Sequence, residues 1–110
     1  MDKGEALKIA GVYIDSIKTK YNIKEAILFG SFAKGNYHDD SDIDIAIVLN
    51  NVVDIIDTQI DLMKLRRKID LRIEPHPFMD CDFNNTNPVV YEILKYGIIV
   101  PGNISLKSAS

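Results

Sequence analysis

Two aspartates lie two residues apart at the start of a β-branched segment, Asp42 and Asp44 in the run Asp-Ile-Asp-Ile-Ala-Ile-Val-Leu. Residues two apart in an extended strand project from the same face, about 6.5 to 7 Å apart along the chain, so both carboxylates point together. Such a pair destabilises a fold unless something positive lies between the two charges. Mg²⁺ suits an oxygen-rich, partly hydrated site, and two ions about 3.5 to 4 Å apart would also bind substrate phosphates.

A third acid at the same end of a neighbouring strand would complete this arrangement. Residues 69–74 alternate apolar and polar side chains before a Pro-His-Pro run, which predicts a strand. Asp70 opens this strand as Asp42 and Asp44 open theirs, whereas Glu74 shares its face but lies about 13 Å further along. We therefore prefer Asp70 as a metal ligand and as the general base for an incoming hydroxyl, and Glu74 stays open as the alternative.

The pair Gly30-Ser31, which ends the apolar run 25–29, supplies the other half of the candidate site. The missing glycine side chain lets backbone N–H groups approach an anion, and the serine hydroxyl adds a donor, so the pair predicts a cradle for a triphosphate. Taken alone, the pair fits a simple helix start better, with Ser31 as the N-cap. Lys34 either contacts phosphate or is solvated, and the sequence does not separate these alternatives.

Other reactive residue types have simpler interpretations. His38, Asp39 and Asp40 fall in an irregular, turn-rich segment and are expected to be solvated. His76 is held between two prolines, where a surface or partner-contact role is favoured over catalysis because the metal mechanism needs no imidazole. Cys81 has no His or Cys at ligand spacing and is interpreted as a structural or incidental thiol.

The elements that must position these residues can be placed from periodicity and capping signals. We expect a small α/β domain with mixed α and β elements, in which a twisted mixed sheet carries the site at one edge and helices pack on the other face. Asn50 and Asn51 are the cap candidates for the second long helix, and Asn87 with Pro88 starts the last one. The expected helices are 5–20, 52–67 and 89–96, and the expected strands are 25–29, 42–49, 69–74 and 98–100.

Length and composition limit the class of protein. A chain of 110 residues with 46% hydrophobic and 26% charged residues is an ordinary packed domain, expected over residues 1–102 with a frayed tail over 103–110. The formal charge of -3 argues against an extended nucleic-acid partner. One cysteine, no signal-peptide pattern and no membrane-spanning run make the cytoplasm the expected compartment, with no membrane partner.

The order of these motifs resembles a known superfamily. Gly-Ser-Phe-Ala-Lys-Gly at 30–35, then a loop, then Ser-Asp-Ile-Asp at 41–44 on a strand, with Asp70 opening a later strand, resembles the nucleotidyltransferases that include DNA polymerase β. The match is closest to the minimal nucleotidyltransferases. The resemblance implies that Gly30 and Ser31 hold the β- and γ-phosphates of a nucleoside triphosphate. It also implies that Asp42 and Asp44 bind the metals, that Asp70 faces the attacking oxygen, and that Lys34 occupies a position that is often basic.

The same resemblance implies an activity and a partner. Two Mg²⁺ ions and ATP would support transfer of AMP to a hydroxyl, with pyrophosphate leaving. Since 110 residues are too few for an acceptor-binding domain as well, a separate subunit is expected, so the protein is a homo- or hetero-oligomer. The expected partner is a small helical toxin of the HEPN class, modified on a tyrosine, so that the chain is its antitoxin. Two alternatives stay open: a non-catalytic antitoxin that acts by contact, and the small subunit of an antibiotic nucleotidyltransferase.

Overall fold

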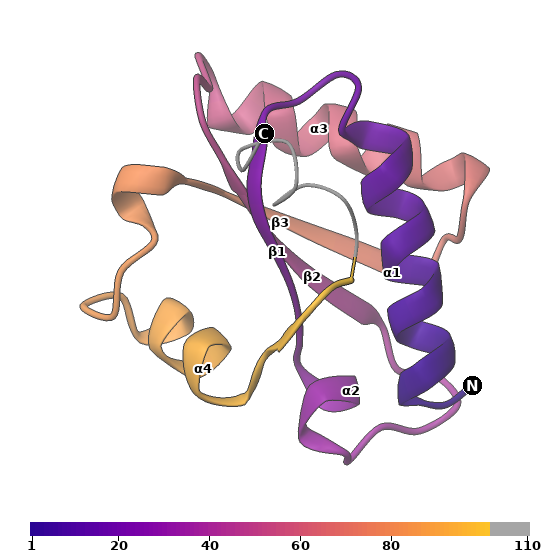
Figure 1. Cartoon of the computed structure of the whole chain (residues 1–110). Helices are drawn as coiled ribbons and strands as arrows, with labels where there is room; N and C mark the ends of the chain where they lie inside the picture. Colours follow the sequence, from indigo (N-terminus) through magenta and orange to yellow (C-terminus); the bar gives the residue numbers. More distant parts are fainter. Residues whose placement is uncertain (102–110) are drawn as a thin grey trace.

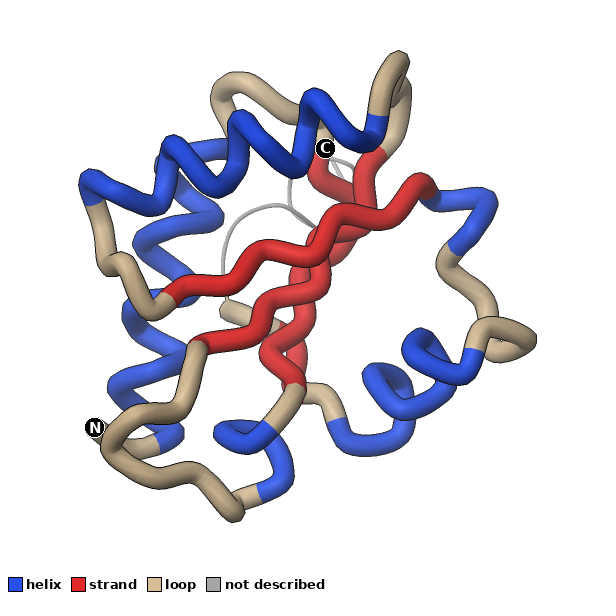
Figure 2. Tube along the Cα trace, turned by 180° about the vertical axis from the view of Figure 1, so that it is seen from behind, coloured by secondary structure: helices blue, strands red, loops and turns tan. Residues whose placement is uncertain are grey.

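A four-stranded sheet forms the centre of the molecule, in the order β3-β2-β1-β4 (Figure 1). The structure is a computed structural model that describes residues 1–101. β1 (Ile23–Phe29) pairs antiparallel with β2 (Ile43–Leu49) and with the short β4 (Ile98–Ile99), and β2 pairs parallel with β3 (Ile73–Met79). Figure 2 shows the strands from behind as one continuous sheet. The predicted mixed sheet of an α/β fold is therefore confirmed.

Two long helices cover one face of this sheet and bury the main core. α1 (Lys3–Ile17) packs beside α3 (Ile55–Leu65), which continues into a 3-10 turn over Arg66–Lys68. The buried Tyr13 hydroxyl donates to the carbonyl of Leu62 at 2.7 Å and so joins the two helices, a bond that contributes about 0.5–1.5 kcal/mol. The largest fully buried side chains of this core are Tyr13, Phe32, Ile14, Ile17, Leu28, Ile43, Ile45, Ile47, Leu49, Leu62 and Ile73.

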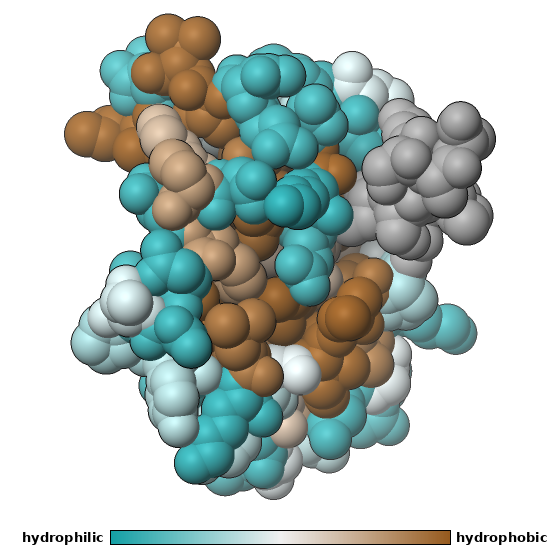
Figure 3. Space-filling model, turned by 60° about the vertical axis from the view of Figure 1, so that its left-hand side comes forward, coloured by the Kyte–Doolittle hydropathy of each residue, from teal (hydrophilic) through white to brown (hydrophobic). Residues whose placement is uncertain are grey.

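The other face of the sheet has a thinner cover. α4 (Pro88–Tyr96) lies there, and its Ile93 packs against Ile27 and Ala46 in a separate, smaller cluster. Several apolar side chains of α4 and β4, Val89, Leu94 and Ile99 among them, are exposed, and Figure 3 shows hydrophobic side chains at the surface on this side. This second face is therefore accessible beside α4, which matters for the site described below.

The start of α4 is as predicted and the start of α3 is not. Asn87 caps α4 with its side chain accepting from the backbone N–H of Val89 at 2.9 Å. For α3 the expected caps Asn50 and Asn51 are wrong, because Asp54 accepts from the N–H groups of the first helical turn. The helix therefore begins at Ile55, three residues later than expected.

The expected strand over 69–74 is also wrong in its bounds, since β3 begins at Ile73 and runs through both prolines to Met79. β3 is an edge strand, so half of its backbone groups face away from β2. The carbonyl of Pro75 is one of these and accepts from Gln59 of α3 at 2.9 Å. A proline at such a position loses no bond of the β2 ladder.

Two further expectations concern the ends of the chain and membranes. The tail over 103–110, expected to be frayed, lies outside the residues that the structure describes. Within residues 1–101, the helices are all too short or too polar to cross a membrane.

Candidate active site

Asp44 lies on the sheet face that α1 and α3 do not cover. Along β2 the side chains alternate, so Ile43 and Ile45 enter the main core while Asp44 and Ala46 face the side of α4. The Asp44 side chain is 26% exposed. Asp42 comes just before the first residue of β2 and is exposed. The two aspartates that spacing predicted are therefore both accessible at the entrance of a buried strand.

The acid beside Asp44 on the neighbouring strand is Glu74. The parallel register pairs Asp44 with Glu74 directly, and paired residues of neighbouring strands lie about 4.8 Å apart and share a face. Arg66 reaches this position from the turn after α3, with Nη1 2.7 Å from the carbonyl of Ile73 and 3.3 Å from Glu74 Oε1. Glu74 is thus a partly exposed carboxylate that is bonded to Arg66 and lies next to Asp44.

Asp70 is placed differently from the sequence-based expectation. It lies three residues before β3, and both of its carboxylate oxygens accept from the Arg72 guanidinium, at 2.9 and 2.6 Å. These hydrogen bonds hold the pKa of Asp70 below its usual range. They also raise the pKa of Arg72, and the negative charge of Glu5, in the first turn of α1, raises it further. Asp70 is paired with Arg72 and has no partner in the β2–β3 register, which begins at Ile73. A role for Asp70 in catalysis stays a prediction.

The Asp70 ion pair has a consequence for stability. Its pKa is lowered in the folded state, so its stabilising contribution is present above the unfolded value of 3.8 and is lost as the pH falls through the folded pKa. We expect Asp70→Asn to unfold at lower urea concentration at neutral pH and to lose less stability than wild type between about pH 6 and pH 3. Urea unfolding across that range measures both effects. Equal acid sensitivity of variant and wild type would contradict the assignment, and Asp39→Asn, in the exposed loop, is the charge-matched control.

The Gly30-Ser31 turn adjoins Asp44 directly. β1 ends at Phe29, which pairs with Asp44 in the register, and Gly30 follows with φ of 75°. A Cβ on Gly30 would overlap Oδ2 of Asp44 and lie 3.2 Å from its carboxyl carbon. Gly30 is the N-cap of the one-turn helix α2 (Ser31–Lys34), so Ser31 is its first residue and makes no capping bond. The alternative of Ser31 as the N-cap is therefore wrong, and a contact between its hydroxyl and phosphate stays a prediction.

Aromatic packing and a buried serine hold the segment between the turn and β2. Phe32 of α2 is buried and stacks on Tyr37 at 4.8 Å between ring centroids. The buried Ser41 accepts from the backbone N–H of His38 at 2.9 Å, and its own N–H donates back to the carbonyl of that residue. His38, Asp39 and Asp40 are exposed, as expected for a solvated turn.

Lys34 is directed toward α4. Its ammonium forms an ion pair with Glu92 and lies 5.2 Å from the centre of the Tyr96 ring. The hydrogen bond to Glu92 raises the pKa of Lys34. These contacts join α2 to α4, and a contact between Lys34 and phosphate stays a prediction.

Sequence reasoning missed His76 as part of the site. Its Nε2 lies 3.0 Å from Oδ1 of Asp44, and its ring packs edge-on against Phe29 at 4.9 Å. The signal was available, since His76 is two residues after Glu74 and would share its face in any strand that continued past Pro75. An expectation that Pro75 ends the strand conceals this relation.

The residues on this face suit a divalent ion by donor chemistry. Asp42, Asp44 and Glu74 offer carboxylate oxygens, the ligands that Mg²⁺ prefers, and all three are at least partly exposed. Within residues 1–101, no cluster of three or more His, Cys, Asp or Glu side chains is already arranged around a metal position. The chain thus holds suitable donors that a bound ion would have to draw together.

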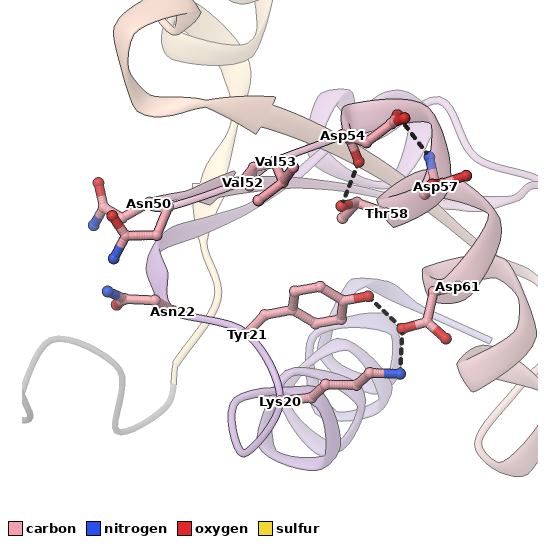
Figure 4. A pocket seen from close by; sticks show the side chains of 11 residues that line it. Lys20, Tyr21, Asn22, Asn50, Val52, Val53, Asp54, Asp57, Thr58 and Asp61 are labelled. Carbon is pink, nitrogen blue, oxygen red and sulfur yellow. Dashed lines mark hydrogen bonds and ion pairs between the residues drawn. The ribbon is translucent and has the colours of Figure 1, made fainter.

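A separate cavity lies at the opposite end of β1 and β2 (Figure 4). Several of its polar side chains bond to other groups of the chain: Asp61 accepts from both Tyr21 and Lys20, and Asp54 caps α3. Hydrogen bonds from these partners lower the pKa of Asp61, while burial and Asp61 raise that of Tyr21. We interpret this cavity as structural, because Lys20, Asp54 and Asp61 of its lining already have partners within the chain.

The fold and this arrangement are those of a nucleotidyltransferase domain. The family described as Polymerase beta, Nucleotidyltransferase matches residues 13–103, most of the chain, and the chain belongs to this family. A protein of Methanocaldococcus jannaschii, provisionally named a protein adenylyltransferase, is 46% identical over 50 residues. That match covers 44% of this chain and 47% of the relative, so the chain spans about half the length of the relative it matches.

Solved structures share the fold. A nucleotidyltransferase from Sulfolobus solfataricus, also provisionally named, has a TM-score of 0.62 and 24% identity, over 88% of this chain and 80% of its own. A toxin-antitoxin structure with AMP-PNP has a TM-score of 0.62 and 20% identity, over 94% and 83%. A mutant of the toxin-antitoxin pair MntA-HpeT has a TM-score of 0.57 and 18% identity, over 99% and 85%.

Proposed function

We propose that this chain transfers AMP from ATP to a hydroxyl group, with Mg²⁺ bound by Asp42, Asp44 and a third carboxylate. The observation that carries the proposal is the contact between the two halves of the site: Asp44 lies against Gly30, at the turn before Ser31, and beside Glu74. Nucleotidyl transfer needs two features: carboxylates that bind metal ions, and a glycine turn whose backbone can approach phosphate. Family membership supports the same reaction.

The residues would divide the work as follows. Gly30 and Ser31 bind the β- and γ-phosphates, and Asp42 and Asp44 hold the ions. When bound, Mg²⁺ neutralises charge on the phosphates and the leaving group. The acceptor hydroxyl oxygen bonds to the α-phosphorus, the bond from that phosphorus to pyrophosphate breaks, and the hydroxyl proton passes to a carboxylate. We assign this proton to Glu74, because it is the acid that the register places next to Asp44.

The acceptor we propose is a tyrosine of a small helical toxin of the HEPN class, which would make the chain an antitoxin that assembles with its target. Support comes from two sources: the partial relative bears the name of a protein adenylyltransferase, and two of the structures with the same fold are toxin-antitoxin structures, one with AMP-PNP. The open second face beside α4 gives a protein acceptor a route to Asp44.

The decisive experiment uses the protein that co-purifies with this chain from its native cell. The purified pair is incubated with ATP and Mg²⁺, and the mass of the partner is measured before and after. A gain of one AMP on a tyrosine is the expected result. An inhibited but unmodified partner would favour an antitoxin that acts by contact, and pyrophosphate release with an aminoglycoside alone would favour an antibiotic-modifying enzyme.

The third carboxylate can be identified with a matched pair of variants. If Glu74 takes the hydroxyl proton, Glu74→Gln lowers the initial rate of partner modification by about 10²–10⁴-fold, the usual contribution of a general base. Asp70→Asn, which removes the same charge from the other candidate, then keeps a rate close to wild type. Rates are measured at saturating ATP and Mg²⁺, with urea unfolding to show that both variants are folded. The reverse pattern would return the role to Asp70.

A further inference from the structure

His76 contacts the same carboxylate that lies against the phosphate turn. Its Nε2 is 3.0 Å from Oδ1 of Asp44, while the other oxygen, Oδ2, is the atom that a Cβ on Gly30 would overlap. The two oxygens of one side chain therefore have separate surroundings. One faces His76 on β3, and the other faces the Gly30 turn at the end of β1.

The chemistry of the pair determines where the imidazole proton is. An ionised carboxylate can only accept a hydrogen bond, so Nε2 of His76 must carry the proton and donate it to Oδ1. A donor at that point restricts the rotation of the Asp44 carboxylate, because turning the carboxylate plane away would leave the N–H without an acceptor, while a half-turn only exchanges two equivalent oxygens. The orientation that results turns Oδ2 toward Gly30.

The sequence around His76 keeps this donor in place. Pro75 and Pro77 flank it, and each has a backbone φ fixed by its ring. His76 pairs with Ala46 in the register, so it stays on the face of Asp44, and its ring is packed edge-on against Phe29. The prolines restrict its backbone and Phe29 contacts its ring, while 41% of the side chain stays exposed.

We propose that His76 is a positioning residue of the nucleotidyl-transfer site, holding Oδ1 of Asp44 so that Oδ2 is presented to the metal and nucleotide at the Gly30-Ser31 turn. The inference rests on the proposed function for what binds there. It adds to that function a residue, His76, that is neither one of the metal-binding carboxylates nor part of the Gly30-Ser31 turn. Loss of a hydrogen-bond partner behind a metal ligand commonly weakens metal binding by about 10–100-fold.

Two variants separate this role from simple packing. His76→Gln keeps an N–H donor at a similar reach and loses the ring, whereas His76→Phe keeps the ring against Phe29 and loses the donor. The probe is Mn²⁺ alone, titrated into the free chain and followed by electron paramagnetic resonance, without nucleotide or acceptor. We expect wild type and His76→Gln to bind Mn²⁺ alike and His76→Phe to bind about 10–100-fold more weakly.

Other outcomes overturn the inference. It is wrong if His76→Phe binds Mn²⁺ as tightly as wild type, if His76→Gln is weakened as much as His76→Phe, or if the wild-type chain does not bind Mn²⁺. Nitrogen-15 NMR of the wild type at about pH 8, where an ordinary imidazole is neutral, gives a test that needs no variant: the Nε2–H form is expected, and the Nδ1–H form would contradict the hydrogen bond.

Failure of the positioning role and failure of the proposed function give different experimental results. Mn²⁺ binding that depends on the His76 donor, together with no transfer of AMP to the co-purified partner, would refute the transfer reaction and leave the positioning role in place. Transfer that proceeds normally in His76→Phe would leave the enzyme assignment in place and refute the positioning role.

Discussion

Asp44→Asn is expected to lower the rate of AMP transfer on the order of a thousandfold, while the chain without metal stays as stable as wild type or becomes slightly more stable. The loss follows because a neutral amide is a poor ligand for Mg²⁺ and because the three atoms nearest to the Gly30 Cβ position all belong to Asp44. The gain in stability follows from removing one of two like charges on neighbouring strands, since Asp44 is paired with Glu74. Asparagine has the same shape, and its carbonyl can still accept from His76.

The measurement combines transfer rates with urea unfolding in the absence of divalent ions. Asp39→Asn removes the same charge from the exposed loop and serves as the control, with activity close to wild type. Full activity in Asp44→Asn would show that the metal is held elsewhere. A fold that is lost in Asp44→Asn would show that Asp44 is needed for the structure itself.

The predictions that succeeded depend on local patterns. The β-branched run predicts β2, and Asp42 and Asp44 lie at its start as expected, while their sharing of one face stays a prediction from the period of two. The break after Phe29 likewise marks the end of β1 from composition alone. A site assembled from residues close in sequence can therefore be recognised before the fold is known.

The third carboxylate could not be settled in this way, because it depends on register between β2 and β3. These strands are separated by α3, and the sequence does not state which residue of one lies beside which residue of the other. Asp70 was preferred because it was expected to open the strand, but β3 starts at Ile73, and this start places Glu74 next to Asp44. A difference of four residues between the expected and the observed start of the strand thus changed the candidate.

Proline and asparagine were misjudged because their meaning depends on direction and on exact boundaries. Pro75 ends a strand only if its missing N–H would have faced a neighbouring strand, and in β3 it faces outward. Asn50 and Asn51 are good caps in general, but the helix starts where Asp54 can accept from two backbone N–H groups. The role of the proline and the position of the helix cap can both be predicted only when the elements that pack beside the segment are known.

Gly30→Ala is expected to reduce both stability and transfer, for two reasons that can be separated. Gly30 has φ of 75° and ψ of -150°, a conformation that costs other residues about 1–3 kcal/mol, and its new Cβ would overlap Oδ2 of Asp44. Gly35→Ala is the matched control, because Gly35 also has a positive φ, 86°, but nothing lies within 4 Å of its Cβ position. We expect Gly35→Ala to lose about 1–2 kcal/mol of stability from backbone strain and to keep transfer.

The overlap with Asp44 can be isolated by a double-mutant cycle measured by urea unfolding. In an Asp44→Ala background the carboxylate is gone, so adding Gly30→Ala should cost only the backbone strain, and less than it costs in wild type. Gly35→Ala should cost the same in both backgrounds. If Gly30→Ala is equally damaging with and without the Asp44 carboxylate, the two halves of the site do not touch as described, and the contact that carries the proposed function is lost with it.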